Sequence, residues 1–394
     1  MQTGVPSDIR SSMLKIISRP PNDEFTLYLF QELVTKGPGR DCESYYMWGT
    51  PPERLESFFE NTLFQSSTVI IGIKDLLDLW KGYSHWQHTQ QAGVDLIVRC
   101  VRRYPDTMFV IFTSLENLYL ELQEPNVQII PWGGDWVNQL IEYRRLEPVA
   151  DKNFASTKTF ISLNRNVRDH RVVLLSYLFG QDLDQHGLIT FLGIGVQEQP
   201  ESENFRERIQ WEFDSHNQHV EPIMQRGYER FYSNQSLVVD DYRIYAPNNS
   251  NDNFSNFNRQ LRHKYRDSFV EIICESSFVT PAFMLTEKTH HSFYAFNFPI
   301  LIAGAGAVAH LREIGFDMFD DIIDHSYDST TNPVDRITQA IDLNRAILTQ
   351  PDLAKALWQA NQDRFWHNLD VARSGMYSWY KQRTLRLIDQ IRWQ

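Results

Sequence analysis

Residues 269–306 alternate between short apolar runs and polar clusters, and this pattern constrains the fold more than any other stretch of the chain. The runs FVEIIC and PILIAG predict two short buried strands, and the intervening TEKT has the composition of a helix start. Strands that alternate with helices form parallel sheets with crossover helices. The stretch therefore predicts an α/β fold with two strand-to-helix junctions close together in sequence.

Polar or small side chains follow both predicted strands of this stretch. Open α/β sheets bind ligands outside the carboxyl ends of their strands, and helix N-termini there attract phosphate. The pattern thus predicts a pocket for a nucleotide or a nucleotide sugar. Its candidate residues are Glu275, Ser276, Ser277, Thr286, Glu287, Lys288, Thr289, Gly304 and Gly306.

The same alternation recurs along the rest of the chain. Apolar runs and helical patterns from SSTVIIGIKDLLDL to WVNQLIEYRRL predict a first domain over residues 1–150. KTFISLNRN, RDHRVVLLSYLFGQ and LITFLGIG repeat the pattern and begin a second domain, over 151–370. Residues 371–394 are amphipathic and predict a helix that can pack back on the first domain. Residues 197–262 are polar and predict a long insertion or loop.

Composition narrows the function classes. The chain has 394 residues, and 38 basic against 50 acidic side chains give a net charge of -12, which disfavours a general DNA-coating role. Three scattered cysteines predict neither a disulfide framework nor a zinc site. No apolar signal core and no run of membrane-helix length stands out. We therefore expect a soluble protein in the cytoplasm, the host cytoplasm if the source is a virus, without a transmembrane segment.

A basic cluster lies at a second strand-to-helix junction, in the sequence NRNVRDHR. Arginine forks bind phosphate oxygens in pairs, and the start of a helix adds partial positive charge. Three arginines and a histidine at a helix start, where the dipole disfavours cations, favour phosphate binding over an ordinary solvated turn. The candidate residues are Asn164, Arg165, Arg168, His170 and Arg171.

The segments CESS, TEKTHHSFYAFNFPILIAGAG and LNRNVRDHRVVLL together resemble the donor-binding half of GT-B glycosyltransferases related to the α1,3-fucosyltransferases and to phage and bacterial glycosyltransferase-like proteins. The resemblance covers about 160–330 well and the N-terminal half only faintly. It implies two Rossmann-like domains facing a central cleft and an inverting transfer of a hexosyl, pentosyl or fucosyl group from a nucleotide-diphosphate sugar. It also implies that no metal or other cofactor is obligatory.

The resemblance assigns roles to individual residues. Glu287 would hold the ribose, while Lys288 and an arginine of the basic cluster would hold the diphosphate of a GDP- or UDP-linked sugar. Glu275 and Ser276 would line the sugar or the nucleotide. This chain has CESS where the fucosyltransferases usually have Asn before the Ser, and this departure leaves the identity of the transferred sugar open.

An inverting transfer needs a general base, usually a carboxylate, to deprotonate the acceptor hydroxyl. Glu116, in SLENL, resembles the Gly-Glu-Asn element of the fucosyltransferases, with Leu115 in place of the glycine. Asp135 follows a Gly pair in PWGGDWV, beside tryptophans that can stack on a sugar. Either carboxylate is equally suited to capping a helix, and both remain candidates for the base.

Three alternatives remain open at this stage. A non-catalytic nucleotide-sugar-binding or scaffold protein would keep the cluster and TEKT but needs no base. A metal-dependent GT-A transferase would use the acidic pair Asp240-Asp241. The acceptor is also open among a glycan, a lipid-linked saccharide and a modified DNA base. A Rossmann dehydrogenase is disfavoured because no GxGxxG motif follows an early strand, and a P-loop phosphotransferase is excluded because the GxxxxGK[ST] motif is absent.

Overall fold

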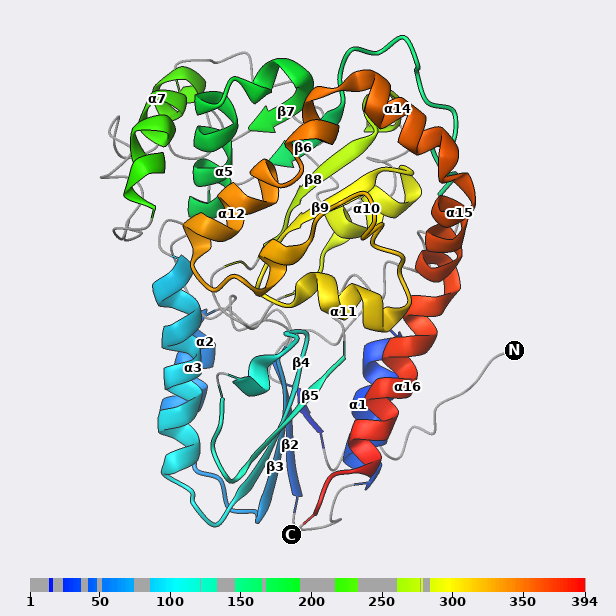
Figure 1. Cartoon of the computed structure of the whole chain (residues 1–394). Coiled ribbons are helices and arrows are strands. Elements are labelled where there is room, and N and C mark those ends of the chain that lie inside the picture. Colours follow the sequence, from blue (N-terminus) through cyan, green and yellow to red (C-terminus); the bar gives the residue numbers. More distant parts are fainter. Residues whose placement is uncertain are drawn as a thin grey trace, which may run out of the picture. The chain divides into compact units, whose positions relative to one another are not determined.

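The fold consists of two α/β units (Figure 1). In the computed structural model, the first unit comprises Met1–Gln139, Pro281–Met284 and Tyr377–Gln394, and the second comprises Leu140–Thr280 and Leu285–Met376. The residues described are 14–16, 24–36, 42–47, 52–73, 86–120, 122–132, 146–164, 168–191, 217–232, 261–276, 278 and 284–393. Within these ranges, no helix is long and apolar enough to cross a membrane.

The first unit is built on a five-stranded parallel sheet whose strands follow one another in chain order. They are β1 (Leu14–Ile16), β2 (Cys42–Tyr46), β3 (Thr68–Ile73), β4 (Met108–Thr113) and β5 (Val127–Pro131). Every residue of β3 and β4 is buried. This is the burial expected of parallel strands that are covered on both faces.

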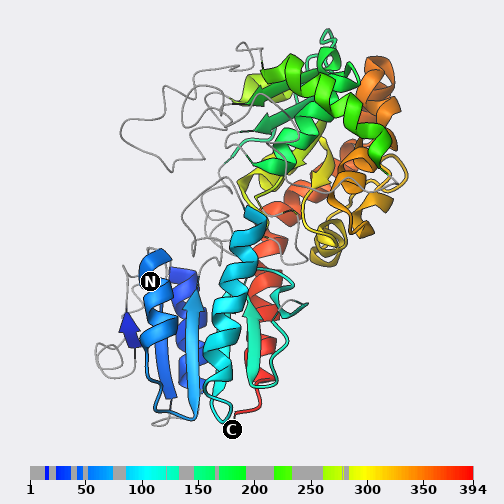
Figure 2. The same cartoon turned by 90° about the vertical axis from the view of Figure 1, so that its left-hand side faces the viewer.

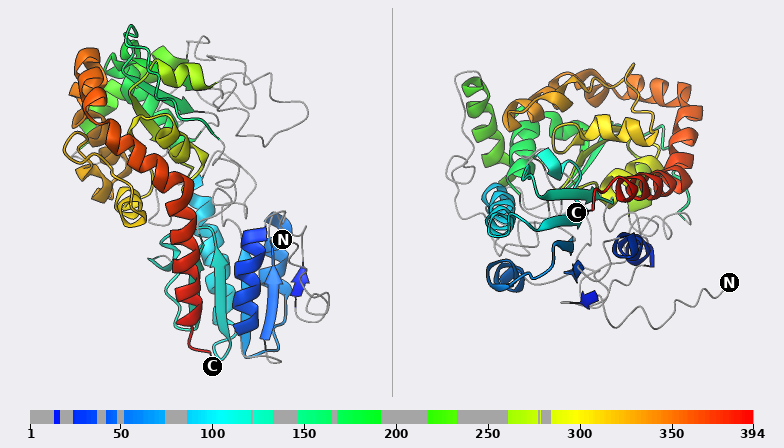
Figure 3. Two further views of the ribbon diagram at one scale, coloured as in Figure 1. Left: turned by 90° about the vertical axis from the view of Figure 1, so that its right-hand side faces the viewer. Right: turned by 90° about the horizontal axis from the view of Figure 1, so that it is seen from below.

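Helices cover both faces of this first sheet. Figures 1 and 3 show α2 (Pro52–Asn61) and α3 (Trp86–Arg102) over one face, and α1 (Glu24–Lys36) and α16 (Met376–Asp389) over the other. On the α2 and α3 face, Phe58 and Ile97 join the main apolar core. The short helix η3 (Leu118–Leu120) follows β4. Helix α16 is tied to this unit by Thr384, whose hydroxyl donates to the carbonyl of Pro131 at 3.2 Å.

The second unit is built on a four-stranded parallel sheet in the order β7-β6-β8-β9. Its strands are β6 (Phe160–Asn164), β7 (Gly187–Phe191), β8 (Val270–Cys274) and β9 (Phe298–Ile302). Its helices are α5 (Asp169–Gly180), η4 (Leu183–His186), η5 (Gln218–Val220), α7 (Glu221–Tyr232), α9 (Arg262–Arg266), α10 (Glu287–Tyr294), α11 (Ala307–Ile314), η9 (Ser326–Ser329), α12 (Pro333–Asp342), α13 (Arg345–Thr349), α14 (Pro351–Ala360), α15 (Gln362–Asp370) and η10 (Val371–Gly375).

The order of these strands creates a topological switch point between β6 and β8. The chain leaves β6 through α5 to reach β7 on one side, and leaves β8 through α10 to reach β9 on the other side. Right-handed crossovers in opposite directions place their helices on opposite faces of a sheet. In agreement, α5 packs against α7 and α12, whereas α10 packs against α15 (Figures 1 and 2). Ligands of open α/β sheets bind at such a point, outside the carboxyl ends of the strands.

The predicted α/β class with parallel sheets is confirmed. The runs that predicted strands in the second domain coincide with β6 to β9, and the helix starts at RDHR and TEKT coincide with α5 and α10. The first 61 residues, for which no element was predicted, contain β1, α1, β2 and α2. The helices predicted from KDLLDL and WVNQLIEYRRL, and most of the predicted loop over 197–262, lie outside the described residues. The loop prediction was wrong for residues 218–232, which form η5 and α7.

Candidate functional site at the carboxyl ends of β6, β8 and β9

The basic cluster and the CESS segment, about 100 residues apart in sequence, meet at the switch point. Arg168 Nη1 donates to the carbonyl of Ser276, and Arg171 Nη2 donates to the carbonyl of Cys274 at 3.2 Å. His170 Nε2 lies 2.8 Å from the carbonyl of Glu275. The start of α5 is thus held to the end of β8.

Most polar groups of this cluster are buried. Arg168 is 7% exposed and Arg171 is 2% exposed, and both use part of their guanidinium on backbone carbonyls. The arginines therefore brace the wall of the site in addition to carrying its charge. Arg165 lies outside the described residues.

His170 is neutral in this position. A carbonyl oxygen only accepts, so the Nε2 atom that faces Glu275 carries the proton. Burial, together with the charges of Arg171 and Arg168, holds the pKa of His170 well below its usual range. The ring stacks on Phe278 with centroids 5.3 Å apart. His170 thus contributes shape and a hydrogen bond to this wall, and it adds no positive charge at neutral pH.

Asn164 closes β6 with no exposed surface. Its Nδ2 donates to the hydroxyl of Ser162 at 3.1 Å, and its Oδ1 has no hydrogen-bond partner among the residues that the structure describes. A buried acceptor without a partner is uncommon in folded proteins. Asn164 is therefore a place where the end of β6 leaves hydrogen-bonding capacity unused.

Glu275 is the carboxylate that fastens α10 to β8. It is fully buried, and Oε1 accepts from the amide of Thr286 at 2.8 Å and from the hydroxyl of Thr289. Oε2 accepts from the Thr286 hydroxyl at 2.6 Å and from the Ser276 amide at 3.2 Å. Because protein donors occupy both oxygens, Glu275 positions the start of α10, and a contact with a sugar or nucleotide stays a prediction.

Glu287 and Lys288, in the first turn of α10, are the charged pair of the site that solvent reaches. Their side chains are 30% and 16% exposed, and Lys288 Nζ lies 3.0 Å from Glu287 Oε1 and 2.9 Å from Thr286 Oγ1. Burial raises the pKa of Glu287, but the adjacent Lys288 outweighs it and lowers this pKa to about 2. A permanent carboxylate and an ammonium group thus stand side by side at the helix N-terminus.

The end of β9 is open beside Gly306. This glycine has φ +86, and a Cβ atom there would meet nothing within 4 Å. It precedes α11, whose first amides are already used, since Asp328 accepts from Val308 N and Ala309 N at 3.2 Å each. The α11 N-terminus is therefore occupied by a side chain of the protein, and Gly306 offers space near β9. Ser277 lies outside the described residues.

A second buried carboxylate, Glu271, supports α10 from β8. Tyr265 donates to its Oε1 at 2.9 Å. Burial raises the pKa of Glu271 from 4.5 to about 8, against the lowering effect of Tyr265, Ser292 and Lys152. Lys152 donates to the carbonyls of Tyr265 and Ala295, both at 2.7 Å, and to the side chain of Asn297.

The raised pKa of Glu271 predicts that the stability of the protein depends on pH. An acid whose folded pKa lies above its unfolded value binds its proton more tightly when folded, so its contribution to stability falls as pH rises from about 4.5 to about 8. The fall approaches ~1.4 kcal/mol per pH unit within that window. Glu271→Gln, which resembles the protonated acid, should not show this fall. Urea unfolding of both proteins at several pH values checks this, and parallel pH curves would contradict it.

Of the two candidate bases, Glu116 lies within the described residues. Glu116 belongs to the first unit, is 1% exposed, and receives a hydrogen bond from Arg383 Nη1 at 2.6 Å. Arg383 also stacks on Trp379, with its Cζ 5.0 Å from the ring centroid. Glu116 therefore anchors α16 to the end of β4, and its role as a base stays a prediction. Asp135 and the acidic pair Asp240-Asp241 lie outside the described residues.

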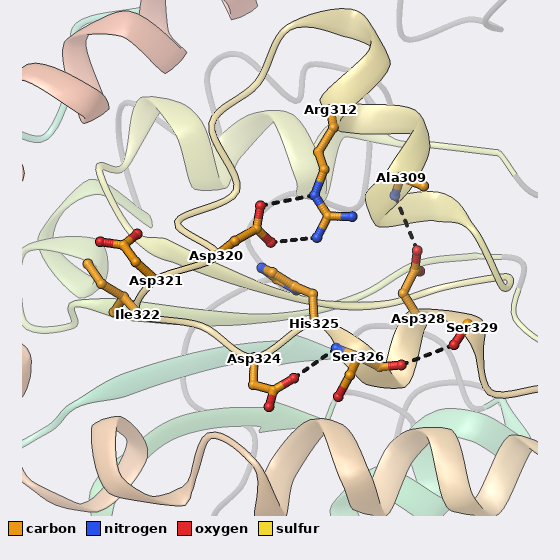
Figure 4. A pocket seen from close by; sticks show the side chains of 10 residues that line it. All are labelled: Ala309, Arg312, Asp320, Asp321, Ile322, Asp324, His325, Ser326, Asp328 and Ser329. Carbon is orange, nitrogen blue, oxygen red and sulfur yellow. Dashed lines mark hydrogen bonds and ion pairs between the residues drawn. The ribbon is translucent and has the colours of Figure 1, made fainter.

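A polar basin of ≈ 600 Å³ is lined by α11 and by residues 320–329 of the second unit (Figure 4). Its charged side chains already have partners: Arg312 pairs with Asp320, Asp328 binds the start of α11, and Asp324 accepts from the amide of Ser326 at 2.9 Å. Throughout the described part of the chain, no group of three or more His, Cys, Asp or Glu side chains has the geometry to hold a metal ion. The charged side chains of the basin are therefore engaged by other groups of the protein.

Two residues at the strand ends escaped the sequence analysis. Phe278 stacks on His170, and Arg336 of α12 lies with its Cζ 4.5 Å from the Phe278 ring centroid. Arg336 Nη1 donates to the carbonyl of Ala303, directly after β9, at 2.9 Å. The only sequence signal for Arg336 is a charged residue among the apolar positions of PVDRITQAID.

The arrangement can bind an anion. It joins permanent cations, two helix N-termini without side-chain caps and open space beside Gly306, all at strand ends of one parallel sheet.

No protein-family model matches the chain, and neither the curated proteins nor the solved structures contain a significant match.

Proposed function

We propose that the protein is a glycosyltransferase that moves a sugar from a nucleotide-diphosphate sugar to an acceptor hydroxyl, with inversion and without an obligatory metal. The observation that carries the proposal is the meeting of Arg168, His170 and Arg171 with the Cys274–Ser276 segment at the switch point between β6 and β8. These are the two segments on which the resemblance to GT-B donor domains rests, and a ligand of an α/β sheet binds at such a point.

The exposed charges at this point suit the two ends of a nucleoside diphosphate. Glu287, a carboxylate at any pH above about 2, can accept hydrogen bonds from ribose hydroxyls. Lys288 supplies a point charge to phosphate, and the N-termini of α5 and α10 add their dipoles. In this proposal, Arg168 and Arg171 supply positive charge and also brace the wall of the site, because each guanidinium donates one hydrogen bond to a backbone carbonyl.

The GT-B arrangement, with the first unit facing the donor unit across a cleft and selecting the acceptor, is part of the proposal. It is supported by the presence of two α/β units, each with its own parallel sheet. The acceptor class remains a glycan, a lipid-linked saccharide or a modified DNA base, and the reaction is placed in the cytoplasm. The base is Glu116 or Asp135.

One observation favours a non-catalytic nucleotide-sugar-binding protein as the second candidate. Glu116 is engaged by Arg383, and it also shares a hydrogen bond with Tyr380, so protein groups already hold one of the two candidate bases. Slow hydrolysis of the donor sugar separates the two candidates. A transferase releases free sugar over hours, whereas a binding protein leaves the donor intact.

A thermal-shift panel tests the proposal. The full chain is heated with GDP, UDP, their sugars and the free nucleosides. A ligand at 100 times its dissociation constant stabilises a protein by about 2.7 kcal/mol, which raises the melting temperature measurably. We expect one nucleotide family to do so. If every nucleotide and nucleotide sugar at millimolar concentration leaves the melting temperature unchanged, the donor site is refuted.

A further inference from the structure

Arg336 is a buried cation that pairs with no anion among the described residues. It is 2% exposed, its Nη1 donates to the Ala303 carbonyl, and its Nε finds no hydrogen-bond partner in the same part of the chain. Within the described residues, no carboxylate lies at ion-pair distance from it. Asp328 acts on it only through space, and burial lowers the pKa of Arg336 to about 10. A buried charge that lacks a counter-ion destabilises a fold unless another group compensates it.

The surroundings of Arg336 place this charge at the candidate site. Phe278 lies between two partners, since it stacks on His170 of α5 and receives the guanidinium of Arg336 from α12. The carbonyl that binds Arg336 follows β9, next to the open space at Gly306. Lys288 stands at the end of the neighbouring strand β8, on the α10 face of the sheet. Two cations thus approach adjacent strand ends from opposite faces.

We propose that Arg336 is a second anion-binding cation of this site, and that the site takes a diphosphate group that crosses the end of β8 between Lys288 and Arg336. The assignment of this diphosphate to a nucleotide sugar rests on the proposed function. The chemistry itself is shared by free pyrophosphate and by any nucleoside diphosphate. Two separated cations suit a diphosphate, whose charge is spread over both phosphates, better than a single phosphate.

Arg336 is also a brace for Ala303 and Phe278, and the test must separate the two roles. If Arg336 is only a brace, its substitution changes the stability of the protein and affects the affinities for charged and uncharged ligands equally. An anion-binding residue changes the affinity for diphosphates and spares that for nucleosides. Arg312 offers a matched control, because it is an arginine of the same unit whose charge is already paired with Asp320.

The experiment is a calorimetric titration of the full chain with pyrophosphate, phosphate, GDP, UDP, guanosine and uridine. We expect Arg336→Met to weaken diphosphate binding about ten- to a hundredfold, the worth of a charged hydrogen bond, with nucleoside binding unchanged. Arg336→Lys should lose about three- to tenfold, since it keeps the charge without the fork. Arg312→Gln should bind like the wild type.

The possible outcomes separate this inference from the proposed function. If folded Arg336→Met binds diphosphates like the wild type, the inference is overturned. If that variant fails to fold, Arg336→Lys decides, and unchanged affinity there overturns it. If pyrophosphate binds in an Arg336-dependent way but no nucleotide binds better than pyrophosphate, the anion site stands and the nucleotide-sugar function fails. If the wild type binds none of the diphosphates, both fail.

Discussion

The Glu275→Ala variant is expected to lose about 3–5 kcal/mol of the unfolding free energy of the second unit, the range for breaking a buried, fully hydrogen-bonded charge. The carboxylate is completely buried and accepts from the amides of Ser276 and Thr286 and the hydroxyls of Thr286 and Thr289. Its removal leaves these donors without their acceptor at the start of α10. Nucleotide binding should fall with it, because Glu287 and Lys288 lose their fixed position.

The measurement is calorimetric or urea unfolding of the full chain, with Asp320→Ala as the control. Asp320 pairs with Arg312, but its side chain is 55% exposed, so its loss should cost less than about 1 kcal/mol. The two units can unfold separately, so the transition assigned to the second unit is the one compared. A Glu275→Ala protein within about 1 kcal/mol of the wild type would contradict the role of Glu275.

Lys288→Met is expected to weaken the binding of nucleoside diphosphates about ten- to a hundredfold and to leave the melting temperature nearly unchanged. The ammonium group is the most exposed cation described at the switch point, and its protein partners are the neighbouring Glu287 and Thr286. Its loss removes the point charge offered to phosphate. Lys288→Arg keeps the charge and should recover part of the affinity.

Lys355→Met is the matched control for this substitution. Its side chain is 18% exposed, against 16% for Lys288, and it lies on α14 near Asp352. Titration calorimetry of the three variants with GDP and UDP gives the comparison. Equal affinities in Lys288→Met and Lys355→Met would remove Lys288 from the site.

Apolar runs and helix starts were sufficient to predict the four strands of the second unit and the starts of α5 and α10, but the polar composition of residues 197–262 did not predict α7. These four strands are short, mostly apolar and flanked by polar turns, so the apolar runs and the turn residues give the same strand boundaries. In the first unit, β2 has the sequence CESYY, in which polar and aromatic residues give no apolar run. Pairing with β1 and β3 decides its structure, and a local pattern does not contain that information.

The candidate site was predictable where it depends on junctions and unpredictable where it depends on packing. Sequence placed the NRNVRDHR and CESS segments at strand ends, and parallel strands bring such ends to one edge. The sequence could not show that the Glu275 carboxylate would accept hydrogen bonds from Thr286 and Thr289, or that Asp328 would accept from the first amides of α11. Arg336 was missed for the same reason, since 33 residues separate it from the carbonyl it binds.

Hydrogen exchange of the full chain with and without a saturating nucleoside diphosphate tests the central claim most directly. The first amides of a helix have no intrahelical acceptor and exchange readily unless a ligand binds them. We expect the ligand to slow exchange in the first turns of α5 and α10, at the amides of residues 169–170 and 287–289. Protection confined to the basin around Arg312 and Asp320, or no protection within these two turns, would contradict a ligand site at the ends of β6, β8 and β9.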